Sequence, residues 1–181
     1  MKQVTFITGN QNKANYLAKY LGMPIEHIKI DLDELQSLDL SVVVEHKVKQ
    51  AYEAIKKPVL VEDVALEFTA LGRIPGPLIK WFLDELDLKT ICSLLDGKDR
   101  SAIGRCMFGY YDGERLELIE GSINGTVPDR PGGESGFGWD PIFIPEGYDV
   151  TRAELSDEDY QKVYEQIRPI KQLKEFLESQ D

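Results

Sequence analysis

Two adjacent carboxylates, Glu62 and Asp63, directly follow the short apolar run 59–61. The run predicts a buried strand, and ligands of open α/β sheets bind at the carboxyl ends of strands. Mg²⁺ prefers hard oxygen ligands of this kind, and a carboxylate beside the ion also orients or deprotonates an attacking water. Glu34, in the acidic run 31–39, is a further candidate ligand, although that run is equally consistent with a solvated loop.

A second group of polar residues lies in segment 8–13, between an expected strand and an expected helix. Backbone N–H groups at a helix N-terminus carry partial positive charge and therefore suit phosphate. Thr8, Asn10 and Lys13 would add a hydroxyl, an amide and an ammonium group. The spacing is not that of a P-loop, and the segment alone is also consistent with an ordinary turn.

The stretch 135–141 places Trp139 and the carboxylate of Asp140 next to glycines. Glycine lets the backbone turn sharply or approach a ligand closely, and Pro141 biases Asp140 toward an extended conformation. A planar heterocycle would stack on the aromatic ring and form hydrogen bonds at its edge with the carboxylate. The alternative is a tight turn whose Trp139 packs into the core.

The elements that must position these residues alternate between strands and helices in the first half, which predicts an α/β fold. Hydrophobic periodicity and turn residues give the expected strands 4–7, 25–32, 59–61, 101–111, 114–126 and 142–144. The same signals give helices at 13–21, from the expected cap Ser41 to about residue 57, at 78–86, at 89–95 and from Ser156 onward, with Pro169 bending the last. Gly22 is expected to end the first helix, and Asp112-Gly113 predicts a hairpin.

Length, charge and cysteine content restrict the class of protein. With 181 residues, a single domain spanning 1–181 is expected. The net charge of −11 argues against binding long nucleic acid, but a few lysines and a divalent ion still suffice for a free nucleotide. No apolar run approaches the ~20 residues of a membrane span. Cys92 and Cys106 lack metal-type spacing, which predicts two free thiols and a cytoplasmic location.

Five motifs, in the same order, resemble those of the inosine triphosphate pyrophosphatase family of nucleotide hydrolases. They are 8–10 with Lys13, 31–36, 59–63, 70–83 and 136–141. Ala153-Glu154-Leu155 is also similar to the family's Ala-Glu-Met or Ala-Glu-Leu. The matches extend over nearly the whole chain.

The resemblance implies an α/β fold with an elongated mixed β-sheet and flanking helices, forming two lobes around a central cleft, usually as a homodimer. It also implies Mg²⁺-dependent hydrolysis of ITP, dITP or XTP to the monophosphate and pyrophosphate. Carried over by position, the implied phosphate ligands are Thr8, Asn10, Lys13, Lys47 and Lys80, and the implied metal ligands are Glu34, Glu62 and Asp63. Asp63 and Lys13 would be catalytic, and the base would bind to Phe137, Trp139 and Asp140.

The C-terminal part departs from the family. Where typical members have Lys and Ser-His-Arg, this chain has Tyr160 and the run 164–166, which contains Glu165. A 6-oxo group on the base requires hydrogen-bond donors, whereas Glu165 is an acceptor. Lys162 and Arg168 are candidate replacements.

This departure leaves two alternatives to the family's activity. One is an enzyme of the same fold with altered base specificity, and the other is a non-catalytic nucleotide-binding protein. The retained Glu34, Asp63 and Lys13 favour an enzyme, because a binding module does not need an activated water.

Overall fold

The computed structural model describes residues 4–22, 24–136 and 138–180. Strand β1 (Thr5–Ile7) is the buried apolar run near the N-terminus, and helix α1 (Gln11–Leu21) follows it. The helix buries Ala14, Leu17 and Leu21, whose spacing places them on one helical face. It ends, as predicted, at Gly22, whose φ of 69° is the left-handed conformation that glycine tolerates best.

Seven strands form one mixed sheet in the order β2-β1-β3-β5-β6-β7, with β4 paired to β3. Strand β1 is parallel to β2 and β3, whereas β4 and β7 are antiparallel to β3 and β6. The strands after β1 are β2 (Glu26–Ile28), β3 (Val59–Phe68), β4 (Pro75–Gly76), β5 (Ser101–Tyr111), β6 (Leu116–Thr126) and β7 (Ile144–Pro145). The predicted α/β class, with a mixed sheet and flanking helices, is confirmed.

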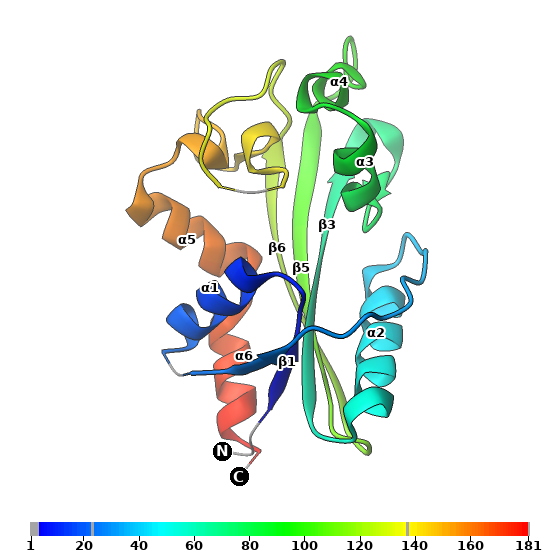
Figure 1. The fold of residues 1–181 in the computed structure, drawn as a ribbon. Coiled ribbons are helices and arrows are strands. Elements are labelled where there is room, and N and C mark those ends of the chain that lie inside the picture. Colours follow the sequence, from blue (N-terminus) through cyan, green and yellow to red (C-terminus); the bar gives the residue numbers. More distant parts are fainter. Residues whose placement is uncertain (1–3, 23, 137, 181) are drawn as a thin grey trace. The chain divides into compact units, whose positions relative to one another are not determined.

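Helix α2 (Leu40–Ile55) lies on one face of the sheet, and α1 and α6 (Ile170–Glu178) lie on the other face, where they contact each other (Figure 1). Asp39 caps α2, because its side chain accepts a hydrogen bond from the Ser41 backbone N–H at 3.2 Å. The cap is therefore Asp39 and not Ser41. The other helices are α3 (Ile79–Glu85), α4 (Leu88–Ser93) and α5 (Asp157–Ile167), with 3₁₀ turns η1 (Thr69–Leu71), η2 (Asp140–Ile142) and η3 (Arg152–Glu154).

The chain divides into two compact units. The first unit comprises 1–63, 106–120 and 169–181, and the second comprises 64–105 and 121–168. Strands β3, β5 and β6 each contribute residues to both units. Within the described residues, no helix combines the length and the apolar character needed to cross a membrane.

Three sequence-based expectations about strands are wrong. The expected strand 25–32 is reduced to the three residues of β2 (Glu26–Ile28). Strand β3 does not stop at residue 61 but continues to Phe68, because the apolar residues after Asp63 keep it buried, so Glu62 and Asp63 lie inside the strand. Of the expected strand 142–144, only Ile144 lies in a strand, β7. Ile142 ends the 3₁₀ turn η2, which starts at Asp140 with Pro141 in its first turn, where the fixed φ of proline favours helical backbone.

Candidate active site

The buried carboxylate in the first unit is Glu62, whose side chain is 0% exposed. Strand β1 pairs with β3 only at Val59 and Leu60, so Glu62 lies just beyond the end of this pairing, next to the turn that leads into α1. Lys13, in the first turn of α1, places its Nζ atom 3.4 Å from Glu62 Oε1. The end of β1 and the start of α1 thus give this carboxylate a cationic partner.

Asp63 has a different lysine. Its Oδ2 atom lies 2.9 Å from Nζ of Lys47, which belongs to α2, and both side chains are partly exposed. Adjacent residues of an extended strand project to opposite faces. The two lysines follow that alternation, because they come from helices on opposite faces of the sheet (Figure 1). Each carboxylate therefore has its own lysine.

The third expected metal ligand, Glu34, is exposed and lies in the connection between β2 and α2, where its neighbour Asp33 accepts a hydrogen bond from Gln50 of α2 at 3.0 Å. In the part of the chain that the structure describes, no three His, Cys, Asp or Glu side chains form a group that could hold a metal ion. Such a group is not required for Mg²⁺, which proteins usually hold through one or two carboxylates together with substrate phosphates and water. Carboxylate oxygens beside lysines fit that pattern.

The expected phosphate loop is organised by its own side chains. Asn10 caps α1, accepting hydrogen bonds on Oδ1 from the backbone N–H groups of Asn12 at 3.0 Å and Lys13 at 3.2 Å. The backbone N–H of Asn10 donates to Thr8 Oγ1 at 3.0 Å. These oxygens act as acceptors inside the loop, so the Thr8 hydroxyl, the Asn10 amide N–H₂ and the Lys13 ammonium retain hydrogens that can be donated to a phosphate.

Lys80 lies in the second unit, on α3, and its Nζ atom is 5.3 Å from the centroid of the exposed Trp81 ring. This distance is within the range of a cation–π contact. Phe137 lies outside the described residues.

Trp139 is 5% exposed and packs edge-on against Phe143, with ring centroids 5.2 Å apart. The neighbouring glycines, Gly136 and Gly138, have φ values of 82° and 65°, so both need a conformation that other residues rarely adopt. The structure thus places the indole in the core of the second unit, at the end of a loop with two glycine-dependent turns.

Asp140 forms a buried cluster with Arg152 and Tyr160, called the Asp140 cluster below. Arg152 Nη1 lies 2.6 Å from Asp140 Oδ1, and both residues are 2% exposed. The Tyr160 hydroxyl donates to Asp140 Oδ2 at 3.0 Å. Burial raises the pKa of the Tyr160 hydroxyl far above its ordinary value, so Tyr160 stays protonated and remains a donor.

Sequence reasoning missed Arg152 as a member of this site. Of the two expected replacements for the family's donors, Lys162 is half exposed and pairs with Glu158 at 2.9 Å and Asp159 at 3.1 Å. The other, Arg168, is buried with its guanidinium 4.3 Å from the ring of Tyr164. The signal in the sequence was the position of Arg152 directly before the Ala-Glu-Leu motif. In the structure Arg152 begins the 3₁₀ turn η3 and is buried.

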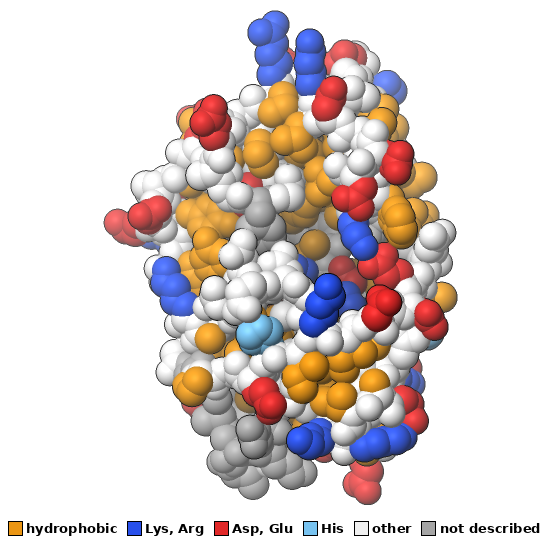
Figure 2. Space-filling model, in the orientation of Figure 1, with side chains coloured by type: hydrophobic (Ala, Val, Ile, Leu, Met, Phe, Trp, Pro, Cys, Tyr) orange, Lys and Arg blue, Asp and Glu red, His pale blue; other side chains and the backbone are white. Residues whose placement is uncertain are grey.

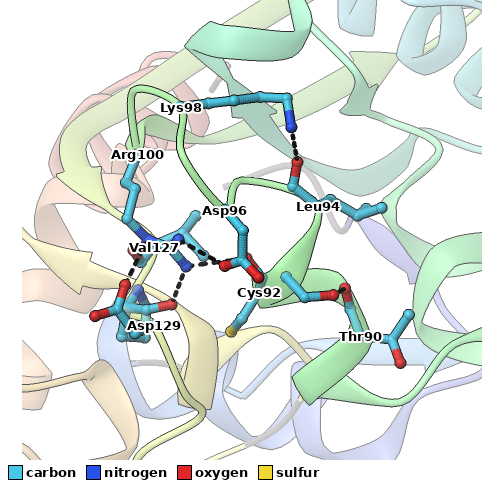
Figure 3. Close-up of polar contacts among 10 residues, drawn as sticks. Thr90, Cys92, Leu94, Asp96, Lys98, Arg100, Val127 and Asp129 are labelled. Carbon is cyan, nitrogen blue, oxygen red and sulfur yellow. Dashed lines mark hydrogen bonds and ion pairs between the residues drawn. The ribbon is translucent and has the colours of Figure 1, made fainter.

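The loop that leads to Trp139 is fixed at its start by Arg100. Figure 3 shows this guanidinium surrounded by backbone carbonyls and carboxylates. It donates to the carbonyls of Val127 at 2.8 Å, Pro128 at 2.6 Å and Cys92 at 2.9 Å. Burial raises the pKa of the Cys92 thiol to about 11, so the sulfur beside this network is a neutral thiol at pH 7.

The same loop is fixed farther along by η3. Thr151 and Glu154 form a capping box, and the Thr151 hydroxyl also donates to the carbonyl of Gly132 at 2.8 Å. The Arg152 backbone N–H donates to the carbonyl of Phe143 at 2.9 Å. The backbone around Asp140 and Arg152 is therefore held by hydrogen bonds that do not involve their side chains.

One face of the surface carries charges of both signs. On the described residues of the face in Figure 2, Lys and Arg side chains are interspersed with Asp and Glu and do not form a continuous basic track. Long nucleic acid requires a continuous basic surface.

Comparison with known proteins gives consistent matches. The model of the Ham1 family matches residues 4–176. Inosine triphosphate pyrophosphatase of Scheffersomyces stipitis is 38% identical over 99% of this chain and 100% of that protein. The protein of the same name from Yarrowia lipolytica is 39% identical over 96% and 95% of the two chains. The solved Ham1 protein of Staphylococcus aureus superposes with a TM-score of 0.78 at 25% identity, covering 98% of this chain and all of that one.

Proposed function

This chain belongs to the Ham1 family and is a hydrolase of nucleoside triphosphates, and we propose that it converts ITP, dITP or XTP to the monophosphate and pyrophosphate with the help of Mg²⁺. The relatives it matches along nearly their whole length are named inosine triphosphate pyrophosphatases. The observation that carries the proposal is the pair of lysine–carboxylate contacts on neighbouring residues of β3.

In this proposal lysines and the start of α1 bind the triphosphate. Lys13, Lys47 and the positive end of α1 bind phosphate oxygens, with Thr8 and Asn10 shaping the loop. Cations beside the phosphates stabilise the charge that develops as water attacks, and the charge on the leaving pyrophosphate. Lys80 is assigned to the triphosphate as well.

Glu34 and Asp63 are the residues that would hold Mg²⁺, and the ion would supply charge neutralisation at the phosphates. Glu62, which was also expected to bind the ion, is fully buried and projects to the other face of β3. Asp63 is also positioned to accept a proton from water, because its partly exposed carboxylate is accessible and is held by Lys47. Glu62, which is fully buried, is suited to fixing Lys13.

Trp139 and Asp140 are assigned to the base, as wall and edge of its pocket, with Phe137 as an additional aromatic contact. We also propose that the enzyme acts on free nucleotides as a cytoplasmic homodimer. The two buried free cysteines are consistent with a reducing compartment.

The test is a panel of ribo- and deoxynucleoside triphosphates with Mg²⁺, in which pyrophosphate and monophosphate are both measured. We expect both products in equal amounts, without inorganic phosphate. Asp63→Asn should reduce turnover by about 10²- to 10⁴-fold, because the carboxylate that contacts water or the ion is lost, while the circular dichroism spectrum stays unchanged.

Glu67→Gln is the matched control, because Glu67 lies in the same strand and pairs with a basic side chain, Arg105, at 3.2 Å. It should retain turnover. Full activity of Asp63→Asn would remove Asp63 from the mechanism. Absence of turnover for every nucleotide by the wild-type protein would instead favour a non-catalytic nucleotide-binding protein.

A further inference from the structure

We propose that Arg152 is a specificity-determining residue that selects 6-oxo purines through the Nε–Nη2 edge of its guanidinium. This inference rests on the proposed function, and it assigns a role in base selection to Arg152. Its basis is the geometry of the Asp140 cluster.

One of the three guanidinium nitrogens of Arg152 is already paired with a carboxylate. Nη1 is directed at Asp140 Oδ1, 2.6 Å away. Nε and Nη2 are buried, and among the described residues neither has a hydrogen-bond partner. Such donors are costly to bury without a partner, which is why nearly all buried polar atoms in proteins have one. The unused pair is one complete side of the guanidinium fork.

The Nε–Nη2 side of the guanidinium matches the hydrogen-bond acceptors of one class of purine. Two parallel N–H donors match the O6 and N7 acceptors of a 6-oxo purine, which is the pairing that arginine makes with guanine. Adenine presents an amine in place of O6, so one donor of the fork would face another donor. The fork therefore discriminates between 6-oxo and 6-amino purines, and it does not read position 2 of the ring.

Two aromatic rings and a carboxylate hold the Arg152 guanidinium. Its Cζ atom is 5.3 Å from the ring centroid of Trp139 and 4.9 Å from that of Tyr160, so aromatic rings fix its plane. Asp140 balances its charge, and the Tyr160 hydroxyl occupies the other oxygen of Asp140. Asp140 is therefore a positioning residue for the fork. Without Arg152, its carboxylate would be an anionic acceptor and would favour a base that presents an amine.

The fork is shielded in the structure. A Cβ atom added at Gly136 would meet Asp140 Oδ2, which places the loop around Gly136 against the Asp140 cluster. Because Arg152 is 2% exposed, a base reaches the fork only after neighbouring groups move. The backbone hydrogen bonds of η3 hold Arg152 itself in place.

The test compares kcat/KM for ITP, GTP and ATP in the wild-type protein, Arg152→Lys and Arg152→Met. The lysine keeps the charge opposite Asp140 but lacks the fork, and the methionine lacks both. We expect each variant to lose about 10- to 100-fold in kcat/KM for ITP and GTP, and less than about threefold for ATP. The ITP/ATP ratio falls, and the ITP/GTP ratio stays constant.

Arg105→Met is the control, because Arg105 belongs to another arginine–carboxylate pair of the second unit, with Glu67. Gly104 faces Trp139 and Phe143, and the strand alternation directs Arg105 to the opposite face of β5. Loss of this arginine should change stability without changing the ITP/ATP ratio.

Different results would contradict the role of Arg152 and the proposed function. A wild-type protein that hydrolyses ATP and ITP equally well would overturn the role of Arg152 without any variant, even if Arg152→Met fails to fold. An unchanged ITP/ATP ratio in Arg152→Lys would overturn it as well. A wild-type protein without turnover of any nucleotide would contradict the proposed function itself.

Discussion

At the scale of single residues, Gly136 occupies a position that suits only glycine. Its φ of 82° is strained for any other residue, and a Cβ atom there would collide with Asp140 Oδ2, the acceptor of the Tyr160 hydroxyl. The glycine is therefore required twice, by backbone conformation and by the Asp140 cluster.

Gly136→Ala should lower the free energy of unfolding by about 1–3 kcal/mol, because the backbone is strained and Asp140 is displaced. It should also reduce the ITP/ATP ratio of kcat/KM, which a purely local strain would leave unchanged. Gly147→Ala is a suitable control, because Gly147 also has a positive φ of 87° but an added Cβ would meet nothing within 4 Å. Urea denaturation and the nucleotide panel would show both effects, and an unchanged stability of Gly136→Ala would contradict the close approach.

At the scale of elements, Asn10 has two roles at the junction of β1 and α1, one structural and one in the proposed phosphate site. As the cap of α1, Asn10 satisfies two backbone donors that the helix itself leaves unpaired. The same N-terminus is the proposed phosphate site, so loss of the cap and loss of phosphate binding must be separated.

Asn10→Asp separates them. Aspartate caps a helix as well as asparagine does, so the free energy of unfolding should change by less than about 0.5 kcal/mol. Its negative charge should repel the triphosphate and raise KM by about tenfold or more. Asn10→Ala, by contrast, should cost about 1 kcal/mol of stability. An unchanged KM in Asn10→Asp would mean that the junction is only a turn.

The elements also show which features a sequence can predict. Helix α1, its end at Gly22 and the hairpin after Tyr111 follow from residues close together in the chain, and all three form as predicted. The length of β3 was missed, because Glu62 and Asp63 interrupt its apolar pattern, and only lysines from α1 and α2 make carboxylates acceptable there.

The Asp140 cluster was missed for a related reason. Its three members come from η2, η3 and α5, and no periodicity in the sequence reports that these elements meet. An arginine in a short polar segment is normally exposed, and its burial becomes evident only with the position of Asp140.

At the scale of the whole molecule, the chain has 32 acidic and 21 basic residues, yet it is expected to bind a polyanion. In the proposed function, the local lysines offset this excess together with Mg²⁺. Binding of a nucleotide should consequently depend on the ion and should stabilise the folded chain as a whole.

A non-hydrolysable ITP analogue with Mg²⁺, at 100 times its Kd, should stabilise the folded state by about 2.7 kcal/mol. For a chain of this size, that corresponds to a rise in Tm of roughly 5–10 °C. EDTA should abolish most of the rise, and the ATP analogue should give a smaller one. An equal rise with and without Mg²⁺, measured by differential scanning fluorimetry, would contradict the role of the ion.

The interleaving of the two units along the chain bears on how the protein is made. The first unit takes its residues from both ends of the sequence, and α6 supplies Ile170, Leu173 and Leu177 to the buried face beside α1. A nascent chain emerges from the ribosome with its N-terminus first. The apolar face of α1 must therefore wait until α6 has been translated, and a ribosome stalled before α6 would leave that face exposed to chaperones.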